Sequence, residues 1–228
     1  MWNRKELKEK AKAAFRANYW KCVAVSVIFL IIAGGFAASM PGNKGAEDAA
    51  MSAQVSGVST TEIVAIVLAL MGVIAAIGTI AFVINLFLIN PLQVGCSKFF
   101  KENAEFPAEF NELGKPFKTN YGTVILAMFL KNLFLALWAL LFVIPAIVKA
   151  YSYRMVPYIL ADEPEISALD AITKSRNMMR GQKWRAFVLD LSFIGWAILS
   201  VLTGGILFVF YVGPYKLQTD AELYLALK

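Results

Sequence analysis

Three ionisable residues, Lys131, Arg154 and Asp190, lie within long stretches of otherwise apolar sequence. An ionised side chain inside a lipid bilayer costs several kcal/mol, so such residues usually pair with one another or face a polar cavity. We expect the three to form an intramembrane polar cluster that serves as a binding or functional site. Two asparagines complete this candidate cluster: Asn85 and Asn132. The simpler alternatives are that Lys131 snorkels to the lipid headgroups and that Asp190 pairs with Arg185.

A second chemically capable group is acidic and consists of Asp162, Glu163 and Glu165. Carboxylates alone can bind Mg²⁺, although solvated acidic residues at the start of a helix are the simpler interpretation. The chain contains 0 His, which removes the commonest general base and the commonest metal ligand. Zincin, phosphate-binding glycine-loop and nucleophile-elbow motifs are absent from the sequence. The sequence therefore predicts no catalytic residue, no metal site and no cofactor, and we expect the protein not to be an enzyme.

The composition shows what kind of element must position these charges. Hydrophobic residues make up 59% of the 228 residues and charged residues 17%, against about 45–50% and about 25% in soluble domains. The excess lies in four runs, 22–38, 63–89, 124–148 and 186–212, and a membrane span needs about 20 predominantly apolar residues. We predict an all-α fold, a polytopic transmembrane helical bundle that forms a single domain over residues 1–228.

Residues 1–21 are predicted to form a basic amphipathic helix. Asn3 is the expected N-cap, and Leu7, Ala11 and Phe15 recur at helical spacing. A charged segment before an apolar run also resembles a cleavable signal peptide, but the helical order favours a retained interfacial helix that leads into the first span. Residues 39–62 are small, polar and almost free of Lys and Arg, which predicts an external loop.

The stretch 142–164 decides the topology, because it places Pro145, Lys149 and Arg154 among apolar residues. If residues 124–148 crossed once, the basic residues that follow would lie outside, against the positive-inside rule. A turn at Ile144–Pro145, with residues 146–161 returning as a helix of about 24 Å, keeps them inside. Residues 162–185 then form a cytoplasmic amphipathic segment, which Ser167 can cap.

This topology gives about six helices arranged as three hairpins with cytoplasmic interfacial helices, and four spans is the alternative. The sequence does not decide whether the last apolar run forms a hairpin. Residues 186–212 either span once or turn at Gly204–Gly205, which is a turn signal. We expect a multi-pass protein of the bacterial cytoplasmic membrane with both termini cytoplasmic.

Basic and aromatic residues near the ends of the apolar runs are predicted to contact anionic lipid headgroups. They are Arg4, Lys5, Lys8, Lys12, Arg16, Lys174, Arg176, Arg180 and Trp184. Headgroups account for the net charge of +6, so a nucleic-acid partner is not required. The expected partners are membrane lipid and either further copies of this chain or another membrane protein.

Motifs in the second half of the chain resemble those of one known family. They are Ile144-Pro145, Lys149, Tyr151-Ser152-Tyr153, Pro157 to Asp162, Leu191 to Trp196, Leu202 to Ile206 and Pro214-Tyr215. Together they are similar to the bacterial integral-membrane family called domain of unknown function 975, and more distantly to the membrane domain of some glycerophosphodiester phosphodiesterases. Ala146 departs from the usual Gly of the family, and Gly205 interrupts its usual Thr-Gly-Ile order. The resemblance implies a polytopic bacterial membrane protein and implies no activity.

Three classes of function are compatible with these features. We expect a non-catalytic membrane protein that binds or passes an amphiphilic or anionic ligand, or that is an accessory to an envelope or membrane complex. The alternatives are a small secondary transporter that acts as an oligomer and a membrane enzyme that acts on lipid phosphoesters.

Overall fold

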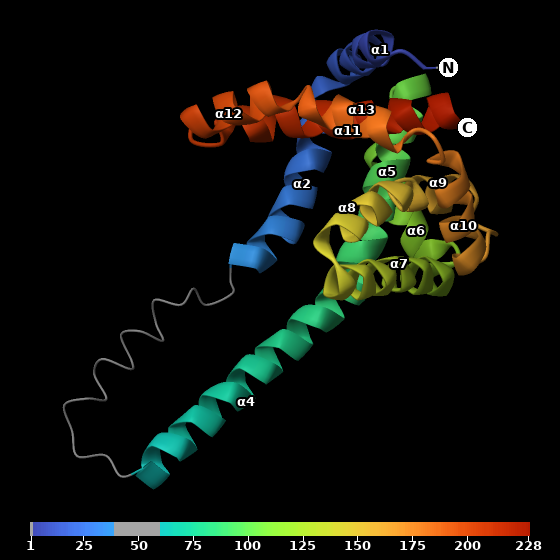
Figure 1. Ribbon diagram of the computed structural model, residues 1–228. Coiled ribbons are helices and arrows are strands. Elements are labelled where there is room, and N and C mark those ends of the chain that lie inside the picture. Colours follow the sequence, from blue (N-terminus) through green and yellow to red (C-terminus); the bar gives the residue numbers. More distant parts are fainter. Residues whose placement is uncertain (1, 39–59) are drawn as a thin grey trace.

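The structure, a computed structural model, describes residues 2–38 and 60–228. The described residues are mainly helical, with short turns between the helices, and contain no strand (Figure 1). The predicted all-α fold class is therefore confirmed. The predicted external loop, 39–62, lies outside the described residues apart from positions 60–62, which begin a helix.

Helix α1, Arg4–Ala17, begins where the sequence predicts, because the Asn3 side chain accepts a hydrogen bond from the backbone N–H of Lys5. Its apolar stripe of Leu7, Ala11 and Phe15 is buried. The stripe packs against helices α5 and α13 of the same chain, so only the basic outer face of α1 is left for solvent or lipid headgroups.

Helix α2, Tyr19–Ala38, leads away from α1, and helix α4, Thr60–Ile84, extends from the rest of the molecule (Figure 1). Between positions 64 and 80 every side chain of α4 is exposed. Since these side chains are apolar, a membrane is the environment that suits them.

Helices α5 and α13 each contain a proline near the first residue and follow a π-helical turn. Helix α5, Asn90–Glu105, holds Pro91 and follows the turn η2, Asn85–Ile89. Helix α13, Gly213–Leu227, holds Pro214 and follows the turn η4, Phe208–Val212. Proline has no N–H to donate, and a widened π turn accommodates its ring within a continuing helix.

The stretch 142–164 turns back on itself, as predicted. The short elements η3, Phe110–Gly114, and α6, Lys115–Lys118, lead into α7, Tyr121–Leu141. Phe142 is extended, with φ −156° and ψ 140°, and α8, Val143–Ser152, returns along α7. The turn therefore precedes Pro145, which lies in the first turn of α8, where its missing N–H leaves no hydrogen bond unmade.

After a break at residues 153–155 the chain forms α9, Val156–Asp162, and α10, Ala168–Met178. The N-cap of α10 is Ser167, as predicted, because its hydroxyl accepts a hydrogen bond from the N–H of Asp170.

The last run of apolar residues turns in its middle. Helices α11, Lys183–Leu191, and α12, Ile194–Leu202, lead out, and the chain returns through η4 into α13. Gly204 and Gly205 form the turn with φ values of 62° and 85°, a region that glycine enters without steric cost. This observation settles the alternative that the sequence leaves open.

Helix α5 lies at the centre of the core and contacts α1, α2, α7, α9, α13 and η3. Its contact with η3 depends on Gly95, because a Cβ at that position would meet the carbonyl oxygen of Leu113 at 2.3 Å. The core formed around α5 contacts α2, the first helix of the α7–α8 hairpin and the last helix, α13.

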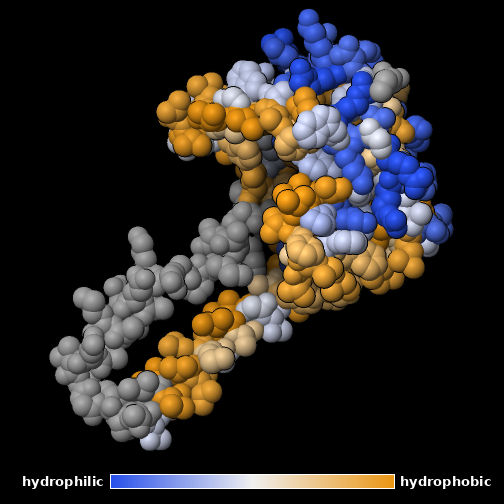
Figure 2. Space-filling view, viewed as in Figure 1, coloured by the Kyte–Doolittle hydropathy of each residue, from blue (hydrophilic) through white to orange (hydrophobic). Residues whose placement is uncertain are grey.

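Three helices of the described chain are long and apolar enough to cross a membrane: Val64–Glu105, Tyr121–Leu141 and Lys183–Leu202. Figure 2 shows hydrophobic residues over α4, the α7–α8 hairpin and α12, and hydrophilic residues over α1, α9 and α10. The protein is therefore a membrane protein whose polar elements gather on one side.

Candidate functional site

Arg154 and Asp190 meet in a bidentate ion pair at the base of the two C-terminal hairpins. Arg154 lies in the break between α8 and α9, and Asp190 lies on α11. The Arg154 Nη1 and Nη2 atoms donate to Asp190 Oδ2 and Oδ1 at 2.9 and 2.8 Å. The predicted pairing of these two residues is therefore present, rather than a pair between Asp190 and Arg185.

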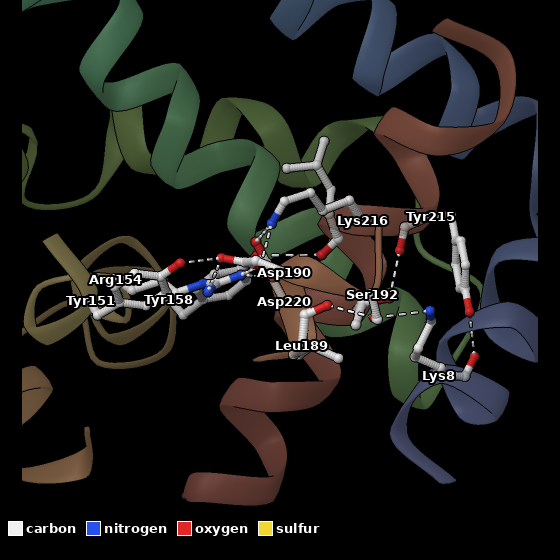
Figure 3. A network of polar contacts seen from close by, with 12 residues as sticks. Lys8, Tyr151, Arg154, Tyr158, Leu189, Asp190, Ser192, Tyr215, Lys216 and Asp220 are labelled. Atoms are coloured by element: carbon white, nitrogen blue, oxygen red, sulfur yellow. Dashed lines mark hydrogen bonds and ion pairs between the residues drawn. The ribbon is translucent and has the colours of Figure 1, made fainter. Parts of the chain in front are cut away.

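Two residues of α13 complete this ion-pair network, which Figure 3 shows. Arg154 Nη2 also donates to Asp220 Oδ1 at 2.5 Å, and Lys216 Nζ donates to Asp190 Oδ1 at 3.0 Å. The Tyr151 hydroxyl donates to Asp190 Oδ2 at 2.9 Å. Two cations face two carboxylates, so the charges balance within the network. Its evident effect is to tie the α8–α9 break, α11 and α13 together.

Lys131 lies apart from this network. It is on α7, its residue exposure is 8%, and among the described residues it makes no hydrogen bond or ion pair. A buried charge without a partner is expensive, because the low dielectric penalises it and nothing compensates.

The Lys131 side chain borders a cavity of about 220 Å³. Arg154 and Asp220 reach this cavity from the ion-pair network, and Gln93, Ser97 and Tyr158 add uncharged polar groups to its wall. Because Arg154 and Asp220 already pair with each other, Lys131 gives the cavity an uncompensated positive charge.

The five residues predicted as one cluster do not all come together. Arg154 pairs with Asp190 and lines the same cavity as Lys131. Asn85 lies at the start of η2, exposed, and Asn132 is exposed and only 3.5 Å from the side-chain oxygen of Asn90. Neither asparagine lines the cavity.

Sequence reasoning missed Lys216 and Asp220. Both lie on α13 at a spacing that lets them pair across one helical turn, and the structure has them 3.6 Å apart. The signal available in the sequence was the presence of two charged residues shortly after the last apolar run, 186–212.

In the acidic group of Asp162, Glu163 and Glu165, the first two carboxylates pair with lysines of the same chain. Asp162 accepts from Lys101 at 2.5 Å and from Tyr224 at 2.8 Å, and it pairs with Lys228 at 2.6 Å. Burial would raise the pKa of Asp162, but the hydrogen bonds from Lys101 and Lys228 outweigh it and hold this pKa well below its usual range. Glu163 pairs with Lys174, and nowhere in residues 2–38 and 60–228 does a group of three or more potential metal ligands form.

The residues predicted to contact headgroups lie on the outer faces of α1 and α10 and at the start of α11. Arg4, Lys5, Arg16, Arg176 and Arg180 are exposed, and Trp184 is 73% exposed. Lys8 and Lys12 are half-buried, and Lys8 Nζ donates to Ser192 Oγ at 3.1 Å. A groove of about 590 Å³ runs between Trp2, Arg4 and Lys5 of the N-terminal segment and Trp184 and Arg185 of α11. Lipid contact at these residues stays a prediction.

Comparison with known proteins gives one match. Residues 126–228 match the model of a family described as "Protein of unknown function (DUF975)". No curated protein and no solved structure matches the chain.

Proposed function

Since residues 126–228 match the model of the DUF975 family, whose description assigns no activity, we propose a function from the cavity itself: the protein is a non-catalytic multi-pass membrane protein that binds an anionic group of an amphiphile at Lys131. The observation that carries the proposal is the buried lysine, which makes no hydrogen bond or ion pair within the described chain. An anion would supply the missing counter-charge and remove the cost of burial.

The rest of the cavity suits a small anionic group. The Gln93 side-chain amide can donate hydrogen bonds to it. The Ser97 hydroxyl donates to the Gln93 backbone carbonyl at 2.9 Å and the Tyr158 hydroxyl to the Leu217 carbonyl at 3.4 Å, so each would have to turn away from that carbonyl to reach an anion. The volume of about 220 Å³ is below the range of about 300–1,000 Å³ that pockets for whole drug-sized molecules occupy. A headgroup therefore fits better than an entire lipid, and Phe29 and Leu135 of the cavity wall offer apolar contact to the carbon atoms next to it.

The orientation in the membrane follows from the charges. The basic outer faces of α1 and α10 lie on the polar side of the molecule (Figure 2), and basic residues favour the cytoplasmic side of a membrane. Both termini would then be cytoplasmic, and the cavity would receive its ligand from the cytoplasmic leaflet or the cytoplasm. A phosphate or carboxylate is the shared chemistry of both sources.

Thermal unfolding in detergent tests this function and separates the two sources. The probes are a phosphatidylglycerol, a phosphatidylcholine with the same chains, and inorganic phosphate. We expect the anionic lipid to raise the melting temperature of the wild type and the zwitterionic lipid to leave it unchanged. At 100 times its dissociation constant, a ligand stabilises by about 2.7 kcal/mol. Stabilisation by inorganic phosphate alone would point to a soluble anion.

Matched variants show whether the effect arises at the cavity. Lys131→Met should abolish the lipid-dependent shift, whereas Lys118→Met, which removes the same charge from an exposed position, should retain it. A shift of wild-type size in Lys131→Met would contradict the proposal.

A further inference from the structure

The two C-terminal hairpins end in exposed tips that contain large apolar side chains and no charged residue. Phe142 and Ile144 at the α7–α8 tip are 71% and 76% exposed, and Val201 and Leu202 at the end of α12 are 79% and 78% exposed. The sequence has no charged residue between positions 132 and 148 or between positions 191 and 215. A hairpin that crosses a membrane completely presents its turn to water, and neither of these turns offers a charge to water.

The distance from each tip to the charges at the base of its hairpin is about half a bilayer. Helix α8 has 10 residues, or about 15 Å at the helical rise, before the break that holds Arg154. Lys131 lies about 15 Å before the end of α7 by the same measure. Helix α12 has 9 residues, or about 14 Å, and Asp190 lies just beyond its start.

Lys149 is nearer to its tip, about 9 Å from the start of α8. Its ammonium group lies over the ring of Trp138, 4.6 Å from the centroid. Trp138 is itself only about 5 Å before the end of α7, so this contact does not carry the charge to the base of the hairpin. The face of the Trp138 ring stabilises the ammonium group where it lies, near the tip.

Charged elements of the polar side also cover the base of the last hairpin. Lys8 of α1 donates to Ser192, between α11 and α12, and its ammonium group lies 4.4 Å from the centroid of the Phe193 ring. The hydroxyl of Tyr215, on helix α13, donates to the backbone carbonyl of Lys8 at 3.2 Å (Figure 3). A basic helix cannot lie at the centre of a hydrocarbon core, so the membrane-embedded part of this hairpin begins after Phe193.

The hydrocarbon core is about 30 Å thick. If the tips reached its far surface, Lys131, Arg154, Asp190 and Lys216 would all lie near its centre. If the tips end at its centre, the same residues lie at the headgroup boundary. We propose that the α7–α8 and α12–η4 hairpins insert from the side that carries the termini and end near the midplane, where the acyl chains of that single leaflet cover their exposed faces.

Helix α4 differs from these hairpins because the sequence has no charged residue between positions 63 and 97. Its 25 residues, or about 37 Å, are enough to cross the whole core without placing a charge at its centre. The membrane part of the protein is then one spanning pair, α2 and α4, beside two half-depth hairpins. The two half-depth hairpins displace lipid from one leaflet only.

Cysteine labelling in sealed membrane vesicles tests the depth of the tips. Phe142→Cys and Leu202→Cys place a thiol at each tip, and the native Cys22 and Cys96 are buried, so the wild type gives the background. We expect a membrane-impermeant maleimide to label neither tip from either side, and to label both once detergent dissolves the bilayer. Ser56→Cys, in the predicted external loop, and Glu165→Cys, an exposed position before α10, are controls for the two faces.

Labelling of either tip from the face that Ser56→Cys reports would overturn the half-depth insertion and establish complete crossings. Labelling from the face that Glu165→Cys reports would overturn it too, because the tips would then lie outside the bilayer. A nitroxide spin label on the same cysteines gives a second measurement. Half-depth insertion predicts high collision with oxygen and little with a water-soluble nickel chelate, and the reverse ratio would contradict it. None of these results depends on a ligand at Lys131.

Discussion

Arg154 donates hydrogen bonds to Asp190 from both of its terminal nitrogen atoms, at 2.9 and 2.8 Å, and to Asp220 from one of them at 2.5 Å. One guanidinium group thus joins three parts of the chain that are distant in sequence. Because both carboxylates pair with Arg154, mutation of the three residues should lower the stability of the protein by unequal amounts.

Arg154→Leu should destabilise the protein more than Asp190→Leu does. Without Arg154, two carboxylates share one lysine, whereas without Asp190 the arginine keeps Asp220. Breaking a truly buried ion pair costs about 3–5 kcal/mol, and the partial exposure of Asp190, 27% of its side chain, lowers the loss expected for that variant. Melting temperatures in detergent provide the measurement.

The double variant Arg154→Leu/Asp190→Leu should recover part of the loss of Arg154→Leu, since one of the two stranded carboxylates is gone. Non-additivity of this kind is the signature of contact. Additive losses, or a larger loss for Asp190→Leu than for Arg154→Leu, would contradict the arrangement of the network.

Asp162 should make the protein sensitive to acid. Its pKa in the folded state lies below its usual range because hydrogen bonds from Lys101 and Lys228 outweigh burial. A carboxyl group with a depressed pKa contributes stability above its unfolded pKa of about 3.9, and that contribution is lost as the pH falls further. The melting temperature of the wild type should therefore drop below about pH 4 more steeply than that of Asp162→Asn.

At pH 7, Asp162→Asn should cost about 1–3 kcal/mol, since it weakens hydrogen bonds to a charged group that is largely buried. Glu165→Gln, at an exposed position in the same segment, should keep the wild-type profile. Equal acid slopes for the wild type and Asp162→Asn would show that the Lys101–Asp162–Lys228 contacts do not govern the acid response.

Gly95→Ala should destabilise the core strongly, because the new methyl group would lie 2.3 Å from a backbone carbonyl oxygen of Leu113. Backbone cannot move aside as a flexible side chain can, so α5 and η3 would have to separate. Gly72→Ala in α4 is the matched control: no atom lies within 4 Å of its Cβ, and a helical Gly→Ala change gains up to about 1 kcal/mol. Yield and melting temperature should fall for the first variant only, and a neutral Gly95→Ala would show that this contact is looser than the structure has it.

Local signals in the sequence predicted two helix starts correctly, but the single return helix predicted over residues 146–161 is wrong, because the chain breaks at residues 153–155 into α8 and α9. Asn3 and Ser167 cap α1 and α10 as expected, since capping depends on residues within one turn. The turns at Phe142 and at Gly204 were also predictable in kind, from proline and glycine among apolar residues. The exact turn residue was not, because Pro145 is equally compatible with a turn and with the first turn of a helix.

Tertiary relationships were less accessible to sequence reasoning. The pairing of Arg154 with Asp190 follows from the need of each for a counter-charge, but Asp220 could join them only if the last helix packs against the α8–α9 break. The buried face of α1 likewise has the spacing of an interfacial helix, and nothing local shows that α13 covers it. Asn85 and Asn132 were grouped with the charges by depth in the membrane alone, and depth does not determine which side of a helix a residue faces.

The central claim is that Lys131 holds an anionic group in its cavity. Native mass spectrometry of the protein purified from its membrane tests it most directly, with Lys131→Met and Lys118→Met prepared in parallel. The account predicts that the wild type and Lys118→Met retain an adduct with the mass of an anionic amphiphile, and that Lys131→Met loses it. The same adduct at the same occupancy on Lys131→Met, or its absence from the wild type, would contradict the account.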